Sequence, residues 1–413
     1  MRRTAPFGAI FGDVPMQKIH VAIVGAGLGG LCLAQALKRA GIAFDVYERD
    51  PALDSRRQGF RIRIDATGQR ALAASLPAGL YALLRASASQ RTAGTRFLTP
   101  RLTPAAARVP ACWQPDPQAS EPEDLADLSI DRLTLREILM AGIEHHVHFG
   151  HAIDRYQVLP DGRVQALFTH GDRVHCDVLV GADGVNSAIR SQLTPAAAPA
   201  DTGSICVYGK TRLPHADVAQ RDETVLRGGT SVVFADGCAA VLEDMRFRAD
   251  LPARAASTVP RCRLSPPDDY FYWALIGPRG RFGLDSLSAV APRLPAALEQ
   301  VARHWHPALQ RLLYETPPSA VAALPVRRGR PDVPLPAGPV TLLGDAIHAM
   351  SPAGGAGANT ALKGAGALAA LLAEHAGSGH GVRHAVTRYA ERMRVWATDA
   401  VAASDRAAAL LFF

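Results

Sequence analysis

The chain has 413 residues, of which 48% are hydrophobic and 20% are charged, and its formal net charge is +7. This length exceeds that of one average domain and predicts two or three structural units with large apolar cores. The basic residues stand singly or in pairs, without a run of five or more like charges, which argues against nucleic-acid binding.

Cysteine usage and hydropathy narrow the class of protein further. The six cysteines are scattered and form no C-x-x-C pair, which argues against a zinc site or a disulfide scaffold and favours a reducing cytoplasm. No apolar stretch approaches the roughly 18 residues that span a membrane. Residues 1–17 begin with basic residues but lack the apolar run of a signal peptide. We therefore expect a cytoplasmic protein with a disordered N-terminal extension.

The first predicted elements form a β-α-β unit. Residues 19–24 predict a buried strand, 25–30 a tight turn, 31–40 a helix that ends at Gly41, and 43–47 a second strand. This succession within about thirty residues is typical of a parallel, doubly wound sheet.

The middle of the chain has a different pattern. Residues 99–123 contain six prolines and predict an irregular excursion, whereas 130–142 predict a helix. Residues 147–183 predict a series of strands, and 200–330 predict short strands with turns and one helix near 294–313.

The C-terminal part returns to the first pattern, with a strand at 340–343 and a helix at 359–374. Because both ends are α/β and the middle is antiparallel β with helices, the simplest organisation is a nucleotide-binding domain interrupted by a substrate domain.

A G-x-G-x-x-G motif, formed by Gly25, Gly27 and Gly30, joins the first strand to its helix. Gly25 allows a tight turn, Gly27 lets a pyrophosphate approach the backbone, and Gly30 lets the helix pack on the strand. Glu48 ends the second strand, where an acidic residue binds ribose hydroxyls. The pattern predicts a dinucleotide site and leaves open both its cofactor and whether the protein is an enzyme.

Two further motifs follow later strands. Asp183 and Gly184 open the segment DGVNSAIR, and Asp345 lies in GDAIHAMSP. The Asp345 carboxylate can accept a hydrogen bond from a ribityl hydroxyl, and the small residues 353–358 let the backbone approach a flat ring. The helix near Asn359 would point its N-terminus at that ring and stabilise negative charge there.

Together, in this order, the three motifs resemble those of the FAD-dependent aromatic hydroxylases, the group A flavoprotein monooxygenases with the p-hydroxybenzoate hydroxylase fold. The resemblance covers about residues 18–375 and is closest to the small branch that modifies tetracycline, urate and polyketides. It implies an α/β fold, with a Rossmann-like FAD-binding domain and its parallel sheet, an inserted α+β substrate domain with an antiparallel sheet, and C-terminal helices. The implied boundaries are 18–90, 130–195 and 335–375 for FAD, 91–129 and 196–334 for substrate, and 376–413 for the C-terminal helical segment.

The resemblance also implies the site residues. FAD contacts are expected from Gly25, Gly27, Leu28, Gly29, Gly30, Glu48, Arg49, Arg56, Arg132, Asp183, Gly184, Asp345, Pro352, Gly355, Gly357, Ala358 and Asn359. Arg57 is an alternative to Arg56. Arg61 and Arg63 alternate along one strand and are candidates for contact with the flavin ring or the substrate, the alternative being a solvated strand face. No dedicated catalytic acid or base is expected.

Three local features complete these expectations. Gly364 and Gly366 lie inside a predicted helix, where glycine is unfavourable, and this indicates close packing against another backbone. Residues 144–151 (EHHVHFGH) are rich in histidine, but a solvated junction is favoured and no metal is expected. We expect His348, within the third motif, to be structural.

The activity implied by the resemblance is a monooxygenation of secondary-metabolism type. NADPH or NADH would transiently reduce non-covalent FAD, and a flavin C4a-hydroperoxide would hydroxylate or epoxidise a small aromatic or polycyclic substrate. The alternatives are a flavin-dependent reductase or oxidase on the same fold, without oxygen insertion, and a non-catalytic FAD-binding protein. The expected partners are the substrate and O2, without nucleic acid or stable membrane association, in a monomer or weak homodimer.

Overall fold

The computed structural model describes residues 19–55, 60–90, 94–105, 125–212, 226–235, 237–259, 262, 264–265, 267–284, 290–375 and 379–411. The expected N-terminal extension, Arg56, Arg57 and most of the proline-rich segment lie outside these ranges.

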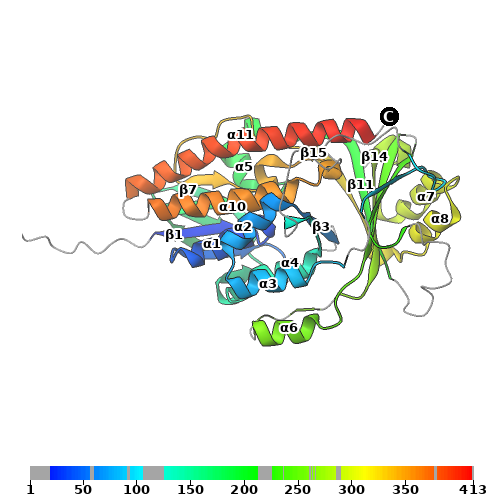
Figure 1. The fold of residues 1–413 in the computed structure, drawn as a ribbon. Helices are drawn as coiled ribbons and strands as arrows, with labels where there is room; N and C mark the ends of the chain where they lie inside the picture. Colours follow the sequence, from blue (N-terminus) through cyan, green and yellow to red (C-terminus); the bar gives the residue numbers. More distant parts are fainter. Residues whose placement is uncertain are drawn as a thin grey trace, which may run out of the picture.

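A five-stranded parallel sheet, in the order β16-β10-β1-β2-β6, organises one side of the molecule (Figure 1). Its central strands are almost completely buried, with Val21, Ile23 and Val180 inaccessible to solvent. Such continuous apolar strands are typical of a parallel sheet covered on both faces. The strands are β1 (His20–Val24), β2 (Ala43–Glu48), β6 (Val147–Phe149), β10 (Val178–Gly181) and β16 (Val340–Leu342).

Helices and small sheets surround this parallel sheet. The first helix, α1, packs against α10, and both contact α2. The helices are α1 (Leu28–Arg39), α2 (Ala66–Ser75), α3 (Ala78–Ala86), α4 (Arg132–Met140), α5 (Ala188–Leu193), α9 (Asp345–His348) and α10 (Gly357–Glu374). The small sheets pair β3 (Arg61–Ile64) with β5 (Leu128–Asp131), and join β7 (Ile153–Val158), β8 (Val164–Phe168) and β9 (Arg173–Cys176).

A second, six-stranded sheet, here called sheet C, has the order β15-β11-β14-β13-β12-β4 (Figure 1). Its neighbours pair antiparallel except β12 and β4, which are parallel. One face carries Phe271, Trp273 and Leu275, which share a core with the helices α7 and α8. The elements are β4 (Arg96–Leu98), β11 (Ala200–Arg212), β12 (Thr230–Ala235), β13 (Cys238–Met245), α6 (Leu251–Thr258), β14 (Tyr270–Pro278), α7 (Val290–Ala302), α8 (Pro307–Tyr314) and β15 (Val321–Arg328).

The last helix, α11 (Gly379–Leu411), joins the two sheets (Figure 1). Early in this helix, Tyr389 lies in the core of the parallel sheet and donates a hydrogen bond to the Leu342 carbonyl at 3.2 Å. Near its end, Ala407 and Leu411 pack with Phe234 of sheet C. One helix of 33 residues therefore contributes to both cores.

Two predicted helices differ from the structure. The helix expected over 130–142 begins only at Arg132, because residues 128–131 pair with β3 and Asp131 caps the helix through the backbone N–H groups of Leu133 and Thr134. The single helix expected near 294–313 is two helices, because α8 starts afresh at Pro307, which has no N–H to continue a preceding helix.

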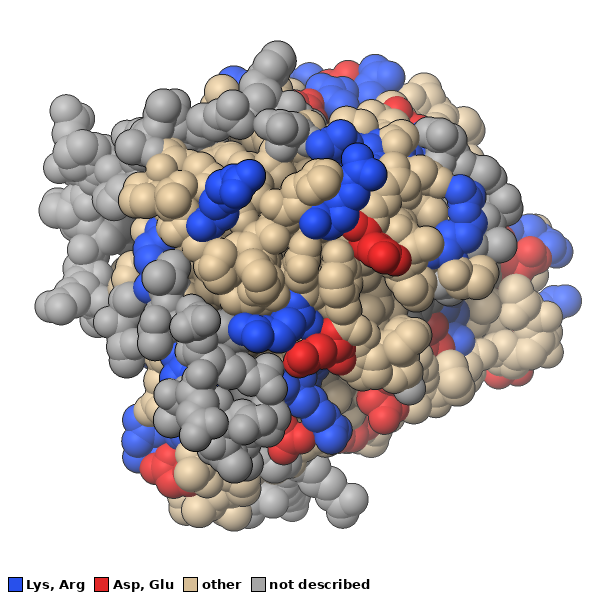
Figure 2. All heavy atoms as spheres, turned by 90° about the vertical axis from the view of Figure 1, so that its right-hand side faces the viewer, with Lys and Arg blue, Asp and Glu red and all other residues tan. Residues whose placement is uncertain are grey.

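Charge is spread over the surface. Figure 2 shows the side of the molecule that carries α7 and α8, where the basic side chains of the described residues stand apart among uncharged and acidic ones. Within the described ranges, no helix combines the length and the apolar character needed to cross a membrane.

The two glycines of α10 occupy different environments. A Cβ added at Gly364 would lie 2.9 Å from Leu343 Cδ1 and 3.2 Å from the Tyr389 hydroxyl, whereas one added at Gly366 meets no described atom within 4 Å. The expected close packing therefore holds at Gly364, against side chains rather than backbone, and not at Gly366.

We predict opposite effects of the same substitution at these positions. Gly366→Ala should raise the free energy of unfolding by up to about 1 kcal/mol through helix propensity. Gly364→Ala should lower it, because overpacking costs about 1–3 kcal/mol and both neighbours are buried. Urea unfolding of both variants at pH 7 measures this difference; equal stabilisation would show that the contact at Gly364 relaxes freely.

Candidate functional site

Three loops meet at the carboxyl edge of the parallel sheet, where β1, β10 and β16 end. The Ala182 N–H donates to the Val24 carbonyl, and the Leu343 N–H donates to the Gly181 carbonyl, both at 2.8 Å. These backbone bonds place the three motifs side by side, as expected where a ligand binds a doubly wound sheet.

In the glycine-rich turn after β1, a side chain would clash with the protein at two of the three glycines and would meet open space at the third. Gly25 has φ +112°, and a Cβ there would lie 2.2 Å from the Ala182 carbonyl oxygen. A Cβ at Gly30 would lie 2.0 Å from the Gly25 oxygen, so that glycine lets the helix approach the strand. At Gly27, apart from its chain neighbours, no described atom lies within 4 Å of the added Cβ. The middle glycine therefore borders space that protein packing does not fill.

Charged side chains hold both ends of the Ala26 residue in this turn. Its N–H donates to Glu48 Oε2 at 2.8 Å, and the second Glu48 oxygen accepts from the Asp50 N–H at 3.0 Å. Its carbonyl accepts from Arg136 Nη2 at 3.0 Å, and Arg136 Nη1 donates to the Leu53 carbonyl. Glu48 and Arg136 are 8% and 9% exposed, so buried side chains hold the turn in place.

The sequence analysis missed Arg136. This residue lies one helical turn after Arg132, so the two share a face of α4. Arg132 itself is half-buried, and its N–H donates to the Phe60 carbonyl at 2.9 Å. The only sequence signal for Arg136 is this spacing, because the distant Ala26 carbonyl is brought to it by the fold.

The second motif is linked directly to the third. Arg190 Nη1 donates to the carbonyls of Val185 and Ala346, each at 2.9 Å, and Ala346 follows Asp345 in the chain. Asp183 Oδ2 accepts from the Ala188 N–H at 2.8 Å, while its Oδ1 is buried without a hydrogen-bond partner among the described residues. Burial raises the pKa of Asp183. Gly184 has φ +81° and lies beside open space.

The third motif combines an exposed carboxylate with a buried imidazole. Asp345 is exposed at the start of α9, directly after Gly344, which has φ +67°. His348 is completely buried, and burial lowers its pKa, so it is neutral at pH 7. Both ring nitrogens of His348 lack a hydrogen-bond partner among the described residues, so its structural role stays a prediction.

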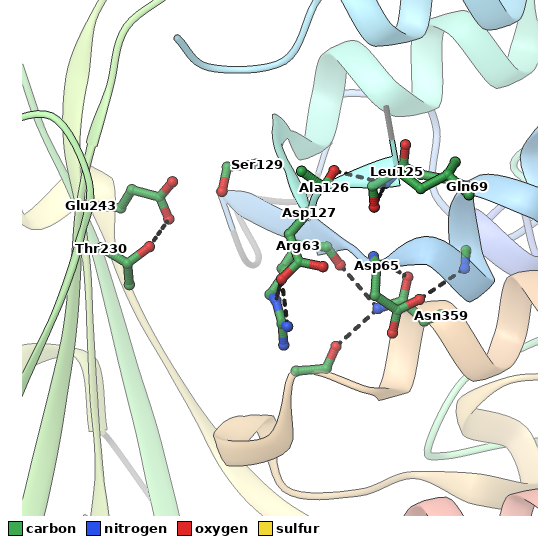
Figure 3. A network of polar contacts seen from close by, with 12 residues as sticks. Arg63, Asp65, Gln69, Leu125, Ala126, Asp127, Ser129, Thr230, Glu243 and Asn359 are labelled. Carbon is green, nitrogen blue, oxygen red and sulfur yellow. Dashed lines mark hydrogen bonds and ion pairs between the residues drawn. The ribbon is translucent and has the colours of Figure 1, made fainter. Parts of the chain in front are cut away.

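Asn359 ties the loop before α10 to the β3-α2 junction (Figure 3). Its Nδ2 donates to the carbonyls of Arg63 and Gly355 at 3.1 and 3.2 Å, and its Oδ1 accepts from the Asp65 N–H at 3.2 Å. The side chain is therefore occupied within the protein. A Cβ at Gly357 would approach Met350 no closer than 3.6 Å, so the start of α10 has room for a side chain.

The remaining expected contacts lie around the same edge. Leu28 is buried, and Gly29 packs against Ala361 and Leu343 of neighbouring elements. The others are exposed or half-buried at this edge: Arg49, Pro352, Gly355 and Ala358.

The two arginines of β3 have different partners. Arg63 pairs with Asp127 at 2.5 Å and is 35% exposed. Arg61 forms an ion pair with Glu243 and donates to Ser129 Oγ at 3.1 Å, and its side chain is only 12% exposed. The solvated strand face considered as an alternative therefore does not apply to Arg61.

Glu243, which the sequence analysis did not single out, is a buried anion on sheet C. It is completely inaccessible and accepts a hydrogen bond from Thr230 Oγ1 at 3.1 Å. Figure 3 shows both residues on the face of sheet C that looks toward Ser129 and Arg63. On the same face lies Tyr272, and the Cζ atom of Arg61 is 5.9 Å from the centroid of the Tyr272 ring. Nothing in the β-strand pattern of β13 marks this acidic residue as inward-facing rather than solvated.

Comparisons with known proteins agree with this geometry. Residues 18–211 and 292–404 match the family described as FAD binding domain. The dual O-methyltransferase/FAD-dependent monooxygenase elcB of Phaeosphaeria nodorum is 35% identical over 87% of the chain and 41% of that protein. The chain thus spans about two fifths of the length of this relative. The aurachin C monooxygenase/isomerase of Stigmatella aurantiaca is 30% identical over 86% of the chain and 80% of that protein.

Solved structures share the fold. A putative FAD-containing monooxygenase from Photorhabdus luminescens subsp. laumondii superposes with a TM-score of 0.76 at 28% identity and covers 96% of this chain and 99% of that one. Klebsiella pneumoniae HpxO, solved with FAD and uric acid, has a TM-score of 0.69 at 20% identity, over 94% and 89% of the two chains.

The buried ion pair between Arg61 of β3 and Glu243 of β13 yields a prediction. Arg61→Met removes a cation from beside the buried Glu243 carboxylate and should lower the free energy of unfolding by about 3–5 kcal/mol. Arg63→Met, on the same strand, breaks a pair that is about one third exposed and should cost no more than about 1 kcal/mol. Urea unfolding at pH 7 compares the two.

A double variant provides the control. Arg61→Met combined with Glu243→Leu removes both charges, so it should be more stable than Arg61→Met alone. Equal losses for Arg61→Met and Arg63→Met would contradict the importance of the buried pair.

Proposed function

The chain belongs to the FAD binding domain family, and from this we propose that it is an FAD-dependent monooxygenase. It takes electrons from NADPH or NADH and inserts one atom of O2 into a small aromatic or polycyclic molecule. FAD is held non-covalently.

The observation that carries the cofactor assignment is the open position at Gly27. Its neighbours Gly25 and Gly30 are required by contacts within the protein, but the space over Gly27 is left unfilled at the N-terminus of α1. A pyrophosphate fits there, because unpaired N–H groups and the helix dipole favour an anion. The residues present therefore fit FAD.

Other residues of the same edge would hold the rest of the cofactor. Glu48 already accepts two backbone N–H groups, but a carboxylate has about four acceptor sites and can also bind ribose hydroxyls. Exposed Asp345 would accept from the ribityl chain, and the N-terminus of α10 would lie toward the ring. We assign 18–90, 130–195 and 335–375 to this FAD-binding part.

The relatives support monooxygenation as the reaction. The chain covers only part of the dual-function fungal protein, but it covers most of the Stigmatella protein, whose name includes a monooxygenase and no methyltransferase. Bound FAD would supply the redox chemistry by accepting electrons from the nicotinamide and activating O2. The protein's own part is to bind, orient and shield the reacting molecules.

The substrate would lie between the loop before α10 and sheet C. Ala353 of that loop belongs to one hydrophobic cluster with Val232 and Ala239 of sheet C and with Ala407 and Leu411 of α11. On the face of sheet C that looks toward β3, Tyr272 lies beside the guanidinium of Arg61, which β3 contributes. Aromatic rings and a guanidinium are suited to hold a flat, oxygenated molecule. We accordingly assign 91–129 and 196–334 to substrate binding.

One prediction tests the cofactor site. Gly27→Ala should leave the thermal melting of the FAD-free protein unchanged, because φ is −74° and the added Cβ meets no described atom. The affinity for FAD should fall at least about tenfold, equivalent to about 1.4 kcal/mol, because the methyl group occupies the place of the pyrophosphate. Fluorescence titration with FAD measures the affinity.

The matched control is Gly94→Ala, which also points into open space but lies away from the three motifs. It should keep the wild-type affinity. If Gly27→Ala binds FAD as tightly as this control, the cofactor does not lie over Gly27.

A second prediction tests the reaction. Phenols, polyketides and heteroaromatic compounds that stimulate NADPH or NADH oxidation should yield a product with one 18O atom when the reaction runs under 18O2. Mass spectrometry of the product gives the count. A stimulating compound that is reduced, or that is oxidised without gaining 18O, would instead establish the reductase or oxidase alternative.

A further inference from the structure

A cluster of two imidazoles and one carboxylate lies beyond the end of β2 and shares no residue with the three motifs described above. His151, His170 and Asp172 each offer one ligand atom, and these three atoms all lie within 4.8 Å of one another. Asp172 Oδ2 is 3.0 Å from His170 Nε2 and 3.6 Å from His151 Nε2. One carboxylate oxygen therefore faces two imidazole nitrogens.

Tight turns position these side chains. His170 and Asp172 flank Gly171, which has φ +100° in the turn between β8 and β9. His151 follows Gly150, which has φ +76° after β6. The two segments are joined by a hydrogen bond from the Thr169 N–H to the Ala152 carbonyl at 2.9 Å. The cluster is therefore held by backbone geometry rather than by long, freely rotating side chains.

The hydrogen bond of His151 Nδ1 determines whether Nε2 turns a hydrogen or a lone pair toward the carboxylate. His151 Nδ1 lies 2.8 Å from the Phe149 carbonyl oxygen, which can only accept, so Nδ1 carries a hydrogen. In the neutral ring, Nε2 then presents a lone pair toward Asp172 Oδ2. Two electron-rich atoms facing each other are unfavourable unless a cation lies between them. A histidine whose other nitrogen is bound to a backbone carbonyl is also the usual arrangement of a metal ligand.

We propose that His151, His170 and Asp172 bind a divalent transition-metal ion of the Zn²⁺ class, with a further coordination position open to solvent. Zn²⁺ binds imidazole nitrogen and carboxylate oxygen at about 2.0–2.2 Å, which places neighbouring tetrahedral ligand atoms about 3.3 Å apart. Two of the three ligand-atom separations, 3.0 and 3.6 Å, bracket this value, and all three atoms lie within 4.8 Å of one another. Ca²⁺ and Mg²⁺ prefer all-oxygen ligands, so the two imidazoles select against them.

The proposal departs from the expectation that the chain holds no metal. That expectation rested on the scattered cysteines and on residues 144–151, whereas two of the three ligands come from the β8-β9 turn, about twenty residues further along. Spacing in the sequence therefore does not reveal the cluster.

The position of the cluster indicates a structural role. The backbone N–H of His151 donates to the Glu48 carbonyl at 2.8 Å, and the His151 ring packs against Tyr47. A bound ion would fasten the β8-β9 turn to the end of β2. We therefore expect it to stabilise the fold at this edge rather than to take part in the oxidation.

The test uses untagged, purified protein, treated with a chelator, dialysed, and titrated with ZnCl2 by isothermal calorimetry. The expected result is one equivalent bound by the wild type, with an increase in melting temperature on zinc addition. His170→Gln and Asp172→Asn change exposed side chains, so they should fold normally. Each should lower zinc affinity at least about tenfold and abolish the thermal shift.

Two control variants exclude other histidines. His146→Gln alters the neighbouring contact with Asp45, and His384→Gln alters a distant imidazole pair with His375. Both should retain wild-type zinc affinity. X-ray absorption at the zinc edge should show only nitrogen and oxygen ligands, two of them imidazoles.

Two outcomes would overturn the proposal. In one, the wild type binds no more zinc than His170→Gln, and the three side chains then form no metal site. In the other, His146→Gln or His384→Gln loses the zinc instead, and the ion then belongs to other histidines. Neither outcome bears on FAD binding, which is measured separately.

Discussion

The cofactor edge, by which we mean the carboxyl edge of the parallel sheet where we propose that FAD binds, depends on how the Ala26 residue is held. Its N–H and carbonyl point in different directions and are taken by Glu48 from β2 and by Arg136 from α4, both buried. Because the turn cannot rotate without breaking charge-assisted hydrogen bonds of about 1.5–3 kcal/mol each, Gly27 stays where the helix N-terminus is exposed. The second and third motifs then align on this turn through backbone bonds between the strand ends.

The two sheets are joined at a few places, and the proposed substrate region lies between them. The long helix α11 packs on the parallel sheet near its start and on sheet C near its end. The loop before α10 and sheet C share a hydrophobic cluster with the end of α11, and β3 reaches sheet C through the ion pair of Arg61 with Glu243. The region between these contacts is bounded by elements of both sheets, so a molecule held there would touch residues from each.

Sequence patterns predicted the parallel sheet well because its strands are short, apolar and bounded by glycine motifs, and because carboxyl ends of parallel strands share one edge. They failed where a distant partner decides the outcome. Residues 128–131 are a strand only because β3 pairs with them. Arg136 and Ala26 are 110 residues apart, and Arg190 and Ala346 are 156 apart. The side chain of Asn359 forms three hydrogen bonds within the protein, with partners that the sequence did not predict.

The buried charges of this protein serve two different ends. Around the cofactor edge they bond backbone groups: Glu48 and Asp183 accept N–H groups, and Arg136 and Arg190 donate to carbonyls. Groups that irregular loops would leave unpaired are thereby satisfied before any ligand arrives, which lowers the entropic cost of ordering the loops on binding. On sheet C, by contrast, Glu243 is neutralised by Arg61, a side chain from another part of the fold. A pair of this kind contributes little net stability but penalises any arrangement that separates its members. The first set of charges therefore prepares the cofactor loops, and the pair fixes how sheet C faces them.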